Sequence, residues 1–255
     1  MPVVAIANQK GGVGKTTTAL GLAAALGKAR QRVTVVDLDP QATATGVLPA
    51  DIPEDAPRIT DLLRQPDAGL QAAQVDAGWP GVSVVPGELS LAAREDSPQW
   101  GDERLLRDVI AASDGAADWV IIDTPPSLKL LTLMALVAAD GVLLVTKAAY
   151  ADLKGTQTFL DKLDLVVQRG LNEDLELKGV IVSMHRKTRE QAVHMNEIRS
   201  IFGERMWEPV VPATVAAEAM ATRGDPPAAL RNRHGGDRLD DVYDALAARL
   251  MGAFN

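Results

Sequence analysis

Three glycines and two lysines are crowded into ten residues near the start of the chain. The segment N-Q-K-G-G-V-G-K-T-T occupies residues 8–17, between the apolar run 3–7 and an alanine- and leucine-rich helical segment. A glycine-rich turn between a strand and a helix lets backbone N–H groups and the positive end of the helix dipole converge on a polyphosphate. Lys15 is then placed to reach the β- and γ-phosphates of a nucleotide, and the Thr16 hydroxyl to hold Mg²⁺. The segment predicts a Walker A phosphate-binding loop.

The loop departs from the strict Walker A pattern at one residue, since Gln9 stands where the first glycine belongs. What remains, K-G-G-V-G-K-T, resembles the deviant Walker A loop of the ParA/MinD group of ATPases. The resemblance implies that Lys10 is the signature lysine, which reaches across an ATP-bound sandwich dimer to the partner's phosphates. The Asn-Gln pair before it is similar to the partition branch, ParA. The nucleotide-binding residues expected here are Gly11, Gly12, Val13, Gly14, Lys15, Thr16 and Thr17.

Two aspartates follow the second apolar run, in the segment D-L-D-P-Q at residues 37–41. Alternation in an extended segment puts Asp37 and Asp39 on one side and Leu38 on the other. The segment resembles the family's Walker A′ motif. The resemblance implies that Asp39 orients or polarises the attacking water and that Asp37 supports the hydration sphere of the Mg²⁺ ion. The expected catalytic residues are Lys10, Lys15 and Asp39.

A third carboxylate, Asp123, ends the apolar run 119–122 and precedes Thr124 and two prolines. Mg²⁺ prefers oxygen ligands and keeps several waters, so a carboxylate that emerges from a buried strand beside Thr16 can complete its coordination through water. The position resembles the Walker B aspartate. The expected metal residues are Thr16, Asp37 and Asp123, and the expected cofactors are ATP and Mg²⁺.

Apolar, β-rich runs alternate with helical patterns along the chain, at residues 3–7, 33–36, 82–85, 119–122, 142–146, 180–183 and 210–211. Such a pattern predicts an α/β fold with a mainly parallel, doubly wound sheet and helices on both faces. Ligands of such sheets bind at the carboxyl ends of the strands. Residues 48–80, with five prolines, predict loops around a short helix at 60–64. The length of 255 residues and the 47% apolar content favour one P-loop NTPase domain over residues 1–255.

Composition excludes several kinds of protein. The chain has no cysteine, which excludes thiolate-ligated iron–sulfur and zinc sites and fits a reducing cytoplasm. We find no leader pattern and no apolar run of ~18 residues, so we expect neither a signal peptide nor a membrane span. The net charge is −8, but residues 37–118 carry 16 acidic and 5 basic side chains, whereas the rest carry 21 basic and 18 acidic ones. A local basic face is therefore compatible with an acidic protein.

Basic residues gather in the C-terminal third, first at residues 185–189 and again at 223–238, where Asp225 and Asp237 interrupt them. The first run resembles the region that ParA proteins without an N-terminal helix-turn-helix use to bind DNA non-specifically. The resemblance implies DNA contacts from Arg186, Lys187, Arg189 and Arg223. A solvated helix face explains the same charges equally well.

Other family positions are matched in part. Met184 and Pro212 resemble residues that pack on the adenine base, but Ala213 replaces the arginine of the family's Ile-Pro-Arg segment. Ala149 likewise replaces a glutamate that often serves the nucleotide or the dimer. Whether these two departures weaken contacts to the nucleotide or across the dimer stays open.

The last helical pattern carries an apolar stripe of Leu239, Val242, Tyr243, Leu246, Leu250 and Phe254. The polar face of that helix is rich in aspartates, which anionic lipid would repel, so we expect core packing and no membrane contact. His185, His194 and His234 lack metal-ligand spacing and are interpreted as ordinary surface or cap histidines.

The resemblance spans the whole chain and implies a cytoplasmic, nucleoid-associated ATPase. ATP and Mg²⁺ would drive a homodimer that binds duplex DNA without sequence preference, and a ParB-type centromere-binding partner would stimulate hydrolysis. Because no segment precedes the first predicted strand, we expect the short form, without operator binding. Three alternatives stay open: an ATPase that positions a protein cargo on the nucleoid, a MinD-like membrane switch, and a metabolic ligase with the same loop.

Overall fold

The structure is a computed structural model that describes residues 1–113, 115, 117–231 and 236–254. Its strands are β1 (Val3–Ala7), β2 (Val33–Asp37), β3 (Val75–Trp79), β4 (Val82–Val85), β5 (Trp119–Asp123), β6 (Gly141–Lys147), β7 (Glu176–Ser183) and β8 (Met206–Trp207). Its α-helices are α1 (Lys15–Lys28), α2 (Thr43–Val47), α3 (Ile59–Leu62), α4 (Ala92–Asp96), α5 (Leu105–Ala111), α6 (Leu130–Ala138), α7 (Tyr150–Gln168), α8 (Arg189–Phe202), α9 (Val215–Arg223) and α10 (Gly236–Ala253).

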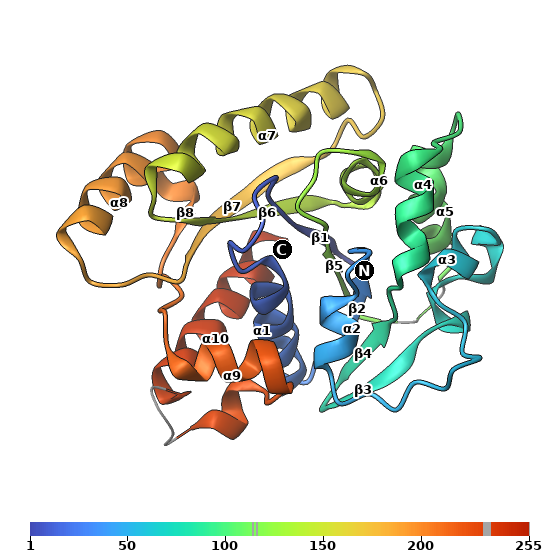
Figure 1. Cartoon of the computed structure of the whole chain (residues 1–255), viewed down its shortest axis with the longest axis horizontal. Helices are drawn as coiled ribbons and strands as arrows, with labels where there is room; N and C mark the ends of the chain where they lie inside the picture. Colours follow the sequence, from blue (N-terminus) through green and yellow to red (C-terminus); the bar gives the residue numbers. More distant parts are fainter. Residues whose placement is uncertain (114, 116, 232–235, 255) are drawn as a thin grey trace.

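In the part of the chain that the structure describes, eight strands form one sheet in the order β3-β4-β2-β5-β1-β6-β7-β8 (Figure 1). Every neighbouring pair is parallel except β3 and β4. The central strands β1, β2 and β5 are buried along their whole length, as expected where helices cover both faces of a sheet. The predicted α/β fold class is confirmed.

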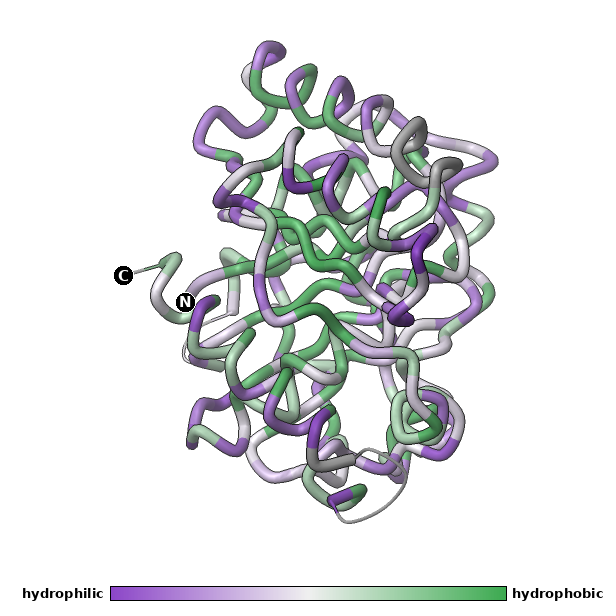
Figure 2. The backbone as a smooth tube through the Cα atoms, turned by 90° about the vertical axis from the view of Figure 1, so that its left-hand side faces the viewer, coloured by the Kyte–Doolittle hydropathy of each residue, from purple (hydrophilic) through white to green (hydrophobic). Residues whose placement is uncertain are grey.

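Two apolar clusters pack on opposite faces of the sheet because successive side chains of a strand point to opposite sides. In β1, Val3 and Ala5 belong to the cluster under α5, α6, α7 and α8, whereas Val4 and Ile6 belong to the cluster under α1, α9 and α10. Figure 2 shows the apolar strands passing through the middle of the molecule, between helices of alternating hydropathy. The stripe predicted for the last helix packs in the second cluster, which confirms its core role.

Two predicted elements lie at other residues than expected, and one strand was missed. The last strand is not 210–211 but Met206–Trp207, since the Trp207 ring is buried over Gly179, where a Cβ would approach it to 2.3 Å. The short helix lies at Ile59–Leu62 rather than 60–64. The antiparallel edge strand β3 was not predicted, because its sequence V-D-A-G-W includes an aspartate and a glycine, both poor strand formers.

The order of the strands determines where a ligand can bind. The chain leaves β1 through residues 8–14, crosses over β5 in helix α1 and returns as β2, so β2, β5 and β1 are adjacent. In β2 and β5, Asp37 and Asp123 are register partners. Within the described residues, no helix is long and apolar enough to cross a bilayer.

Candidate functional site

The loop at residues 8–14 lies over the carboxyl end of β1 and leads into α1. Gly12 and Gly14 have φ angles of +68° and +87°, a left-handed conformation that glycine adopts without a Cβ penalty. A Cβ at Gly14 would lie 3.3 Å from the Ser183 hydroxyl, and that hydroxyl donates to the Val13 carbonyl. The buried Asn8 amide donates to the Val145 carbonyl at 2.7 Å and accepts from the Lys10 amide at 2.9 Å. Hydrogen bonds to β6 and β7 therefore fix the loop.

The two lysines of the loop lie in different surroundings. Lys15 is 6% exposed, and its ammonium donates to the Lys10 carbonyl at 3.2 Å. Burial lowers the pKa of Lys15, while the charges of Asp123 and Asp39 oppose this shift. Lys10 is half-buried at the rim of the loop. A cation fixed beside the loop amides is suited to bind the phosphates of a nucleotide.

The three predicted carboxylates lie together at the edge of the sheet. Neither oxygen of the fully buried Asp123 accepts a hydrogen bond from any residue that the structure describes. Burial raises the pKa of Asp123 well above its usual range, the Asp37 charge raises it further, and the nearby Thr16 hydroxyl and Lys15 ammonium oppose the rise. Buried carboxylate oxygens without partners are costly unless a cation neutralises them. The donor set therefore fits a hard divalent cation such as Mg²⁺.

Asp37 is also buried, but its carboxylate has partners. The Thr45 amide and hydroxyl donate to Oδ2 at 2.7 and 2.6 Å, and the Asp39 amide approaches Oδ1 at 3.3 Å. Burial raises the pKa of Asp37 to about 6, against the effect of the Thr45 hydrogen bonds. Asp39 is 9% exposed, and its carboxylate accepts from the Gln41 amide at 2.9 Å. Leu38, between them, packs in the core, as alternation predicts.

A cavity of about 350 Å³ opens beside the loop and α1. Met184 and Pro212, the two residues predicted to pack on a base, both line it, and Met184 has a φ of +52°. The cavity is also lined by Ala213, which the sequence placed in the base-packing segment, and by residues not expected there, namely Arg186, Gln191, Glu218 and the buried Tyr243. Its volume is in the range of small-molecule sites. The arrangement can hold the base and sugar of a nucleotide whose phosphates lie on the loop.

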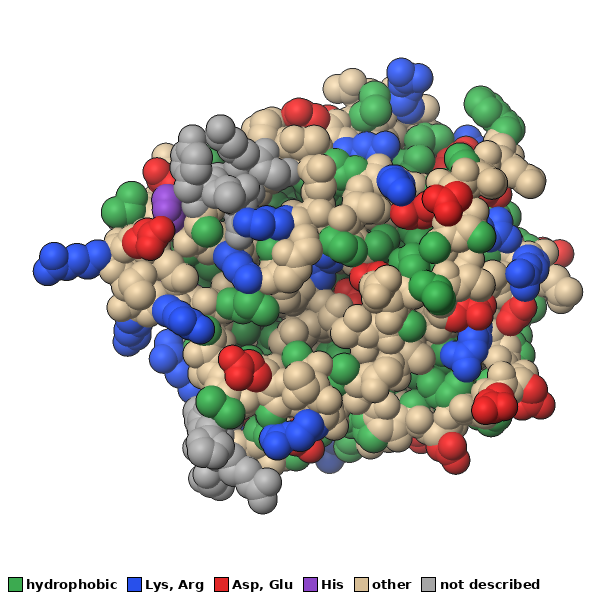
Figure 3. Space-filling view, viewed as in Figure 1, with side chains coloured by type: hydrophobic (Ala, Val, Ile, Leu, Met, Phe, Trp, Pro, Cys, Tyr) green, Lys and Arg blue, Asp and Glu red, His purple; other side chains and the backbone are tan. Residues whose placement is uncertain are grey.

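The predicted DNA-binding residues are not equivalent in the structure. Lys187 and Arg189 are exposed at the start of α8, on the side of the molecule where Figure 3 shows lysine and arginine side chains gathered (left). Arg186 is exposed too, but it lines the cavity, which gives it a second possible role. Arg223 pairs with Asp225 at 3.3 Å. Arg233 and His234 lie outside the described residues.

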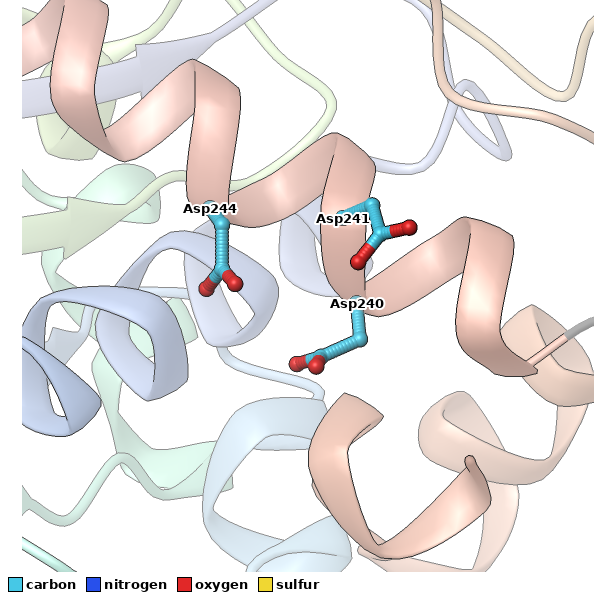
Figure 4. A group of neighbouring side chains, drawn as sticks. All are labelled: Asp240, Asp241 and Asp244. Atoms are coloured by element: carbon cyan, nitrogen blue, oxygen red, sulfur yellow. The ribbon is translucent and has the colours of Figure 1, made fainter. Parts of the chain in front are cut away.

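A second acidic group, Asp240, Asp241 and Asp244, lies on α10, with carboxylates close enough to hold a metal ion (Figure 4). Basic side chains already neutralise it. Lys28 contacts Asp240 at 2.9 Å and Asp244 at 2.6 Å, while Arg231 pairs with Asp240 and, at 2.8 Å, with Asp241. These ion pairs tie α10 to the end of α1, which is a structural role.

Comparison with known proteins agrees with this geometry. The family described as AAA domain matches residues 1–177. The chain is 36% identical over 237 residues to the chromosome partitioning protein ParA of Myxococcus xanthus, covering 88% of this chain and 80% of that one. A solved structure of cobyrinic acid a,c-diamide synthase from Mycobacterium smegmatis, with bound ATP analog and magnesium, is 33% identical, has a TM-score of 0.76 and covers 88% of this chain and 92% of that one. Cyanothece apo McdA, 20% identical, shares the fold with a TM-score of 0.86 over 98% of this chain and 99% of that one.

Proposed function

The chain belongs to the ParA-type partition ATPases, and we propose that residues 1–255 form one Mg²⁺-dependent ATPase domain that binds DNA as an ATP-bound dimer. One observation carries the proposal. The phosphate loop with its buried Lys15 and the carboxylates of Asp37, Asp39 and Asp123 meet at the ends of three adjacent strands. The relative from Mycobacterium smegmatis, solved with an ATP analog and magnesium, supports the choice of nucleotide and metal.

Each residue at this edge has a proposed part in hydrolysis. The amides of residues 11–17 and the Lys15 ammonium bind the phosphates, and Met184 and Pro212 hold the base. Thr16, Asp37 and Asp123 hold the magnesium ion, directly or through water. When bound, that ion neutralises charge on the transferred phosphoryl group. Asp39 orients the attacking water, which places its effect on the chemical step rather than on binding.

The proposed dimer depends on Lys10. The lysine lies at the rim of the loop, and its amide is held by Asn8, so the site has an extra cation beside the one that α1 provides. We propose that Lys10 of each protomer completes the phosphate site of the other. The exposed basic residues Lys187, Arg189, Arg186 and Arg223 would then form a doubled patch that binds duplex DNA through its phosphates. A ParB-type partner would stimulate hydrolysis and release the DNA.

The test is equilibrium binding of a fluorescent ATP analogue with and without Mg²⁺, followed by light scattering to measure mass. We expect Mg²⁺-dependent binding and a shift from monomer to dimer with the analogue but not with ADP. Binding without any change in mass would overturn the dimer, and no binding would overturn the ATPase itself.

A second candidate is an ATP-dependent ligase, because the Mycobacterium smegmatis relative is a cobyrinic acid a,c-diamide synthase by its description. A ligase would consume ATP only with an acid and an amine donor present, whereas the proposed ATPase turns over without either. Phosphate release is measured in buffer with DNA alone, without organic acid or amine. Steady release would favour the partition ATPase, and release only after an acid and an amine are added would favour the ligase.

A further inference from the structure

Thr45 connects two parts of the candidate site. It lies in the short helix α2, eight residues after Asp37, and its amide and hydroxyl both donate to Asp37 Oδ2, at 2.7 and 2.6 Å. The other carboxylate oxygen, Oδ1, has a longer contact of 3.3 Å, from the Asp39 amide. Two short hydrogen bonds to one oxygen fix the plane of the carboxylate.

The direction of the hydroxyl proton is set by a third group. The Gly87 amide, just after β4, donates to Thr45 Oγ1 at 2.9 Å. An amide N–H can only donate, so the hydroxyl accepts there and its own proton is directed to Asp37. The chain of bonds runs from Gly87 through Thr45 to Asp37. The order of donors makes Thr45 Oγ1 a dedicated donor to the carboxylate.

Gly87 is packed too closely for any larger residue. A Cβ at that position would lie 2.7 Å from the Asp37 carbonyl oxygen and 2.9 Å from its carboxyl carbon. Backbone at residue 87 therefore approaches Asp37 directly as well as through Thr45. The carboxylate is held from two sides, by α2 and by the segment after β4.

We propose that Thr45 is a positioning residue that orients the Asp37 carboxylate for the magnesium ion through the Gly87–Thr45–Asp37 hydrogen-bond chain. The role rests on the proposed Mg²⁺-dependent nucleotide binding. Removing a group that orients a ligand through a hydrogen bond typically lowers metal affinity tenfold to a hundredfold. Thr45 lies in α2, outside the phosphate loop and outside the lining of the cavity beside it, so we expect the affinity for nucleotide without metal to stay the same.

The test compares Thr45→Val with Thr45→Ser and with Thr43→Val, a matched control on the exposed side of the same helix. A fluorescent ATP analogue is titrated in EDTA, and the Mg²⁺ concentration that gives half of the affinity gain is then measured. We expect Thr45→Val to raise that concentration about tenfold with unchanged binding in EDTA. Thr45→Ser, which keeps the hydroxyl, and Thr43→Val should both behave like the wild type.

Two results would overturn the role of Thr45. One is an unchanged Mg²⁺ midpoint in Thr45→Val, and the other is an equal loss of nucleotide affinity with and without metal, which indicates general damage to the loop. Thermal melting of each variant identifies loss of folding, and if Thr45→Val does not fold, Thr45→Ala, which removes the hydroxyl without placing a methyl group there, is titrated in its place with the same expected result. A wild type that binds no nucleotide would overturn the proposed function instead, which keeps the two failures distinguishable.

Discussion

The edge of the sheet around β1, β2 and β5 and the start of α8 carry charged residues under opposite conditions. At the sheet edge, Asp37 and Asp123 are fully buried, and strands on both sides fix their positions. At the start of α8, Lys187 and Arg189 are exposed to solvent. A buried charge is costly unless a partner neutralises it, whereas an exposed charge costs little wherever it lies. Burial therefore indicates a chemical role for the carboxylates at the sheet edge. At α8, a DNA-binding surface and an ordinary solvated helix face would both expose the same basic side chains, so exposure does not distinguish them.

The largest effect expected at the buried edge comes from Lys15→Ala. Its ammonium is the fixed counter-charge nearest the expected phosphates, so we expect Mg²⁺·ATP binding to fall by about a hundredfold or more. Isothermal titration measures this directly. Lys162→Ala removes a lysine from α7, which does not contribute to the loop, and is the control. Unchanged affinity in Lys15→Ala would refute the phosphate loop.

The next effect separates binding from chemistry. Asp39→Ala should leave the affinity for the ATP analogue within about twofold and lower the rate of phosphate release by about a hundredfold, since a group that positions or polarises a water acts in the chemical step. Single-turnover hydrolysis with saturating ATP gives the rate. Full turnover in Asp39→Ala would move the water-orienting role to another residue.

The salt dependence of DNA binding tests the exposed basic residues at the start of α8. If each protomer neutralises about two or three phosphates, log K for duplex DNA should fall with log salt at a slope of about −4 to −5 in the dimer. Because Arg186 also lines the cavity, the sharper variant is Lys187→Ala with Arg189→Ala, and we expect its slope to be markedly shallower. Arg30→Ala with Arg64→Ala removes the same charge elsewhere. Equal slopes in both double variants would make the α8 residues a solvated face.

The smallest effect concerns stability without ligands. The folded-state pKa of Asp37 is raised to about 6 and that of Asp123 well above its usual range, so the folded chain binds more protons than the unfolded one. Its free energy of unfolding should therefore fall as pH rises from about 4 through about 6 and higher, by about 1–3 kcal/mol. Asp123→Asn should be more stable than the wild type at pH 8 and less sensitive to pH.

Urea unfolding of the nucleotide-free protein at pH 5 and pH 8 measures this effect. Asp51→Asn, at an exposed position, is the control for removing one carboxylate. The same loss of stability between the two pH values in Asp123→Asn and in the wild type would show that the buried pair does not cause it.

The sequence predicted the buried site at the ends of β1, β2 and β5 far better than the role of the exposed residues at the start of α8. The loop, the D-x-D-P-Q segment and Asp123 are local patterns tied to apolar strands, so their convergence followed from the order of the strands in a doubly wound sheet. Strand β3 was missed because its aspartate and glycine are poor strand formers. The position of β8 was missed because the packing of the Trp207 ring over Gly179 is a contact between distant segments.

Roles that depend on long-range contacts could not be predicted from the sequence. The Gly87–Thr45 bond and the Ser183–Val13 bond join residues 42 and 170 positions apart. Arg186 was predicted as a DNA contact from its neighbours in sequence, but the fold also places it beside the cavity. Thr45 follows Asp37 by only eight residues, but this spacing alone does not predict a hydrogen bond. The bond forms because α2 brings Thr45 back to the end of β2.

Nucleotide bound at the buried site is expected to control DNA binding by the exposed basic residues at the start of α8. Fluorescence anisotropy of a labelled random-sequence duplex at ~50 mM salt tests it, with wild-type protein and Mg²⁺ and either a non-hydrolysable ATP analogue or ADP. We predict binding with the analogue, little or none with ADP, and loss of the difference in Lys10→Ala, because only the completed dimer doubles the basic patch. Equal binding with both nucleotides, or no binding with either, would show that the nucleotide does not control DNA binding in this way.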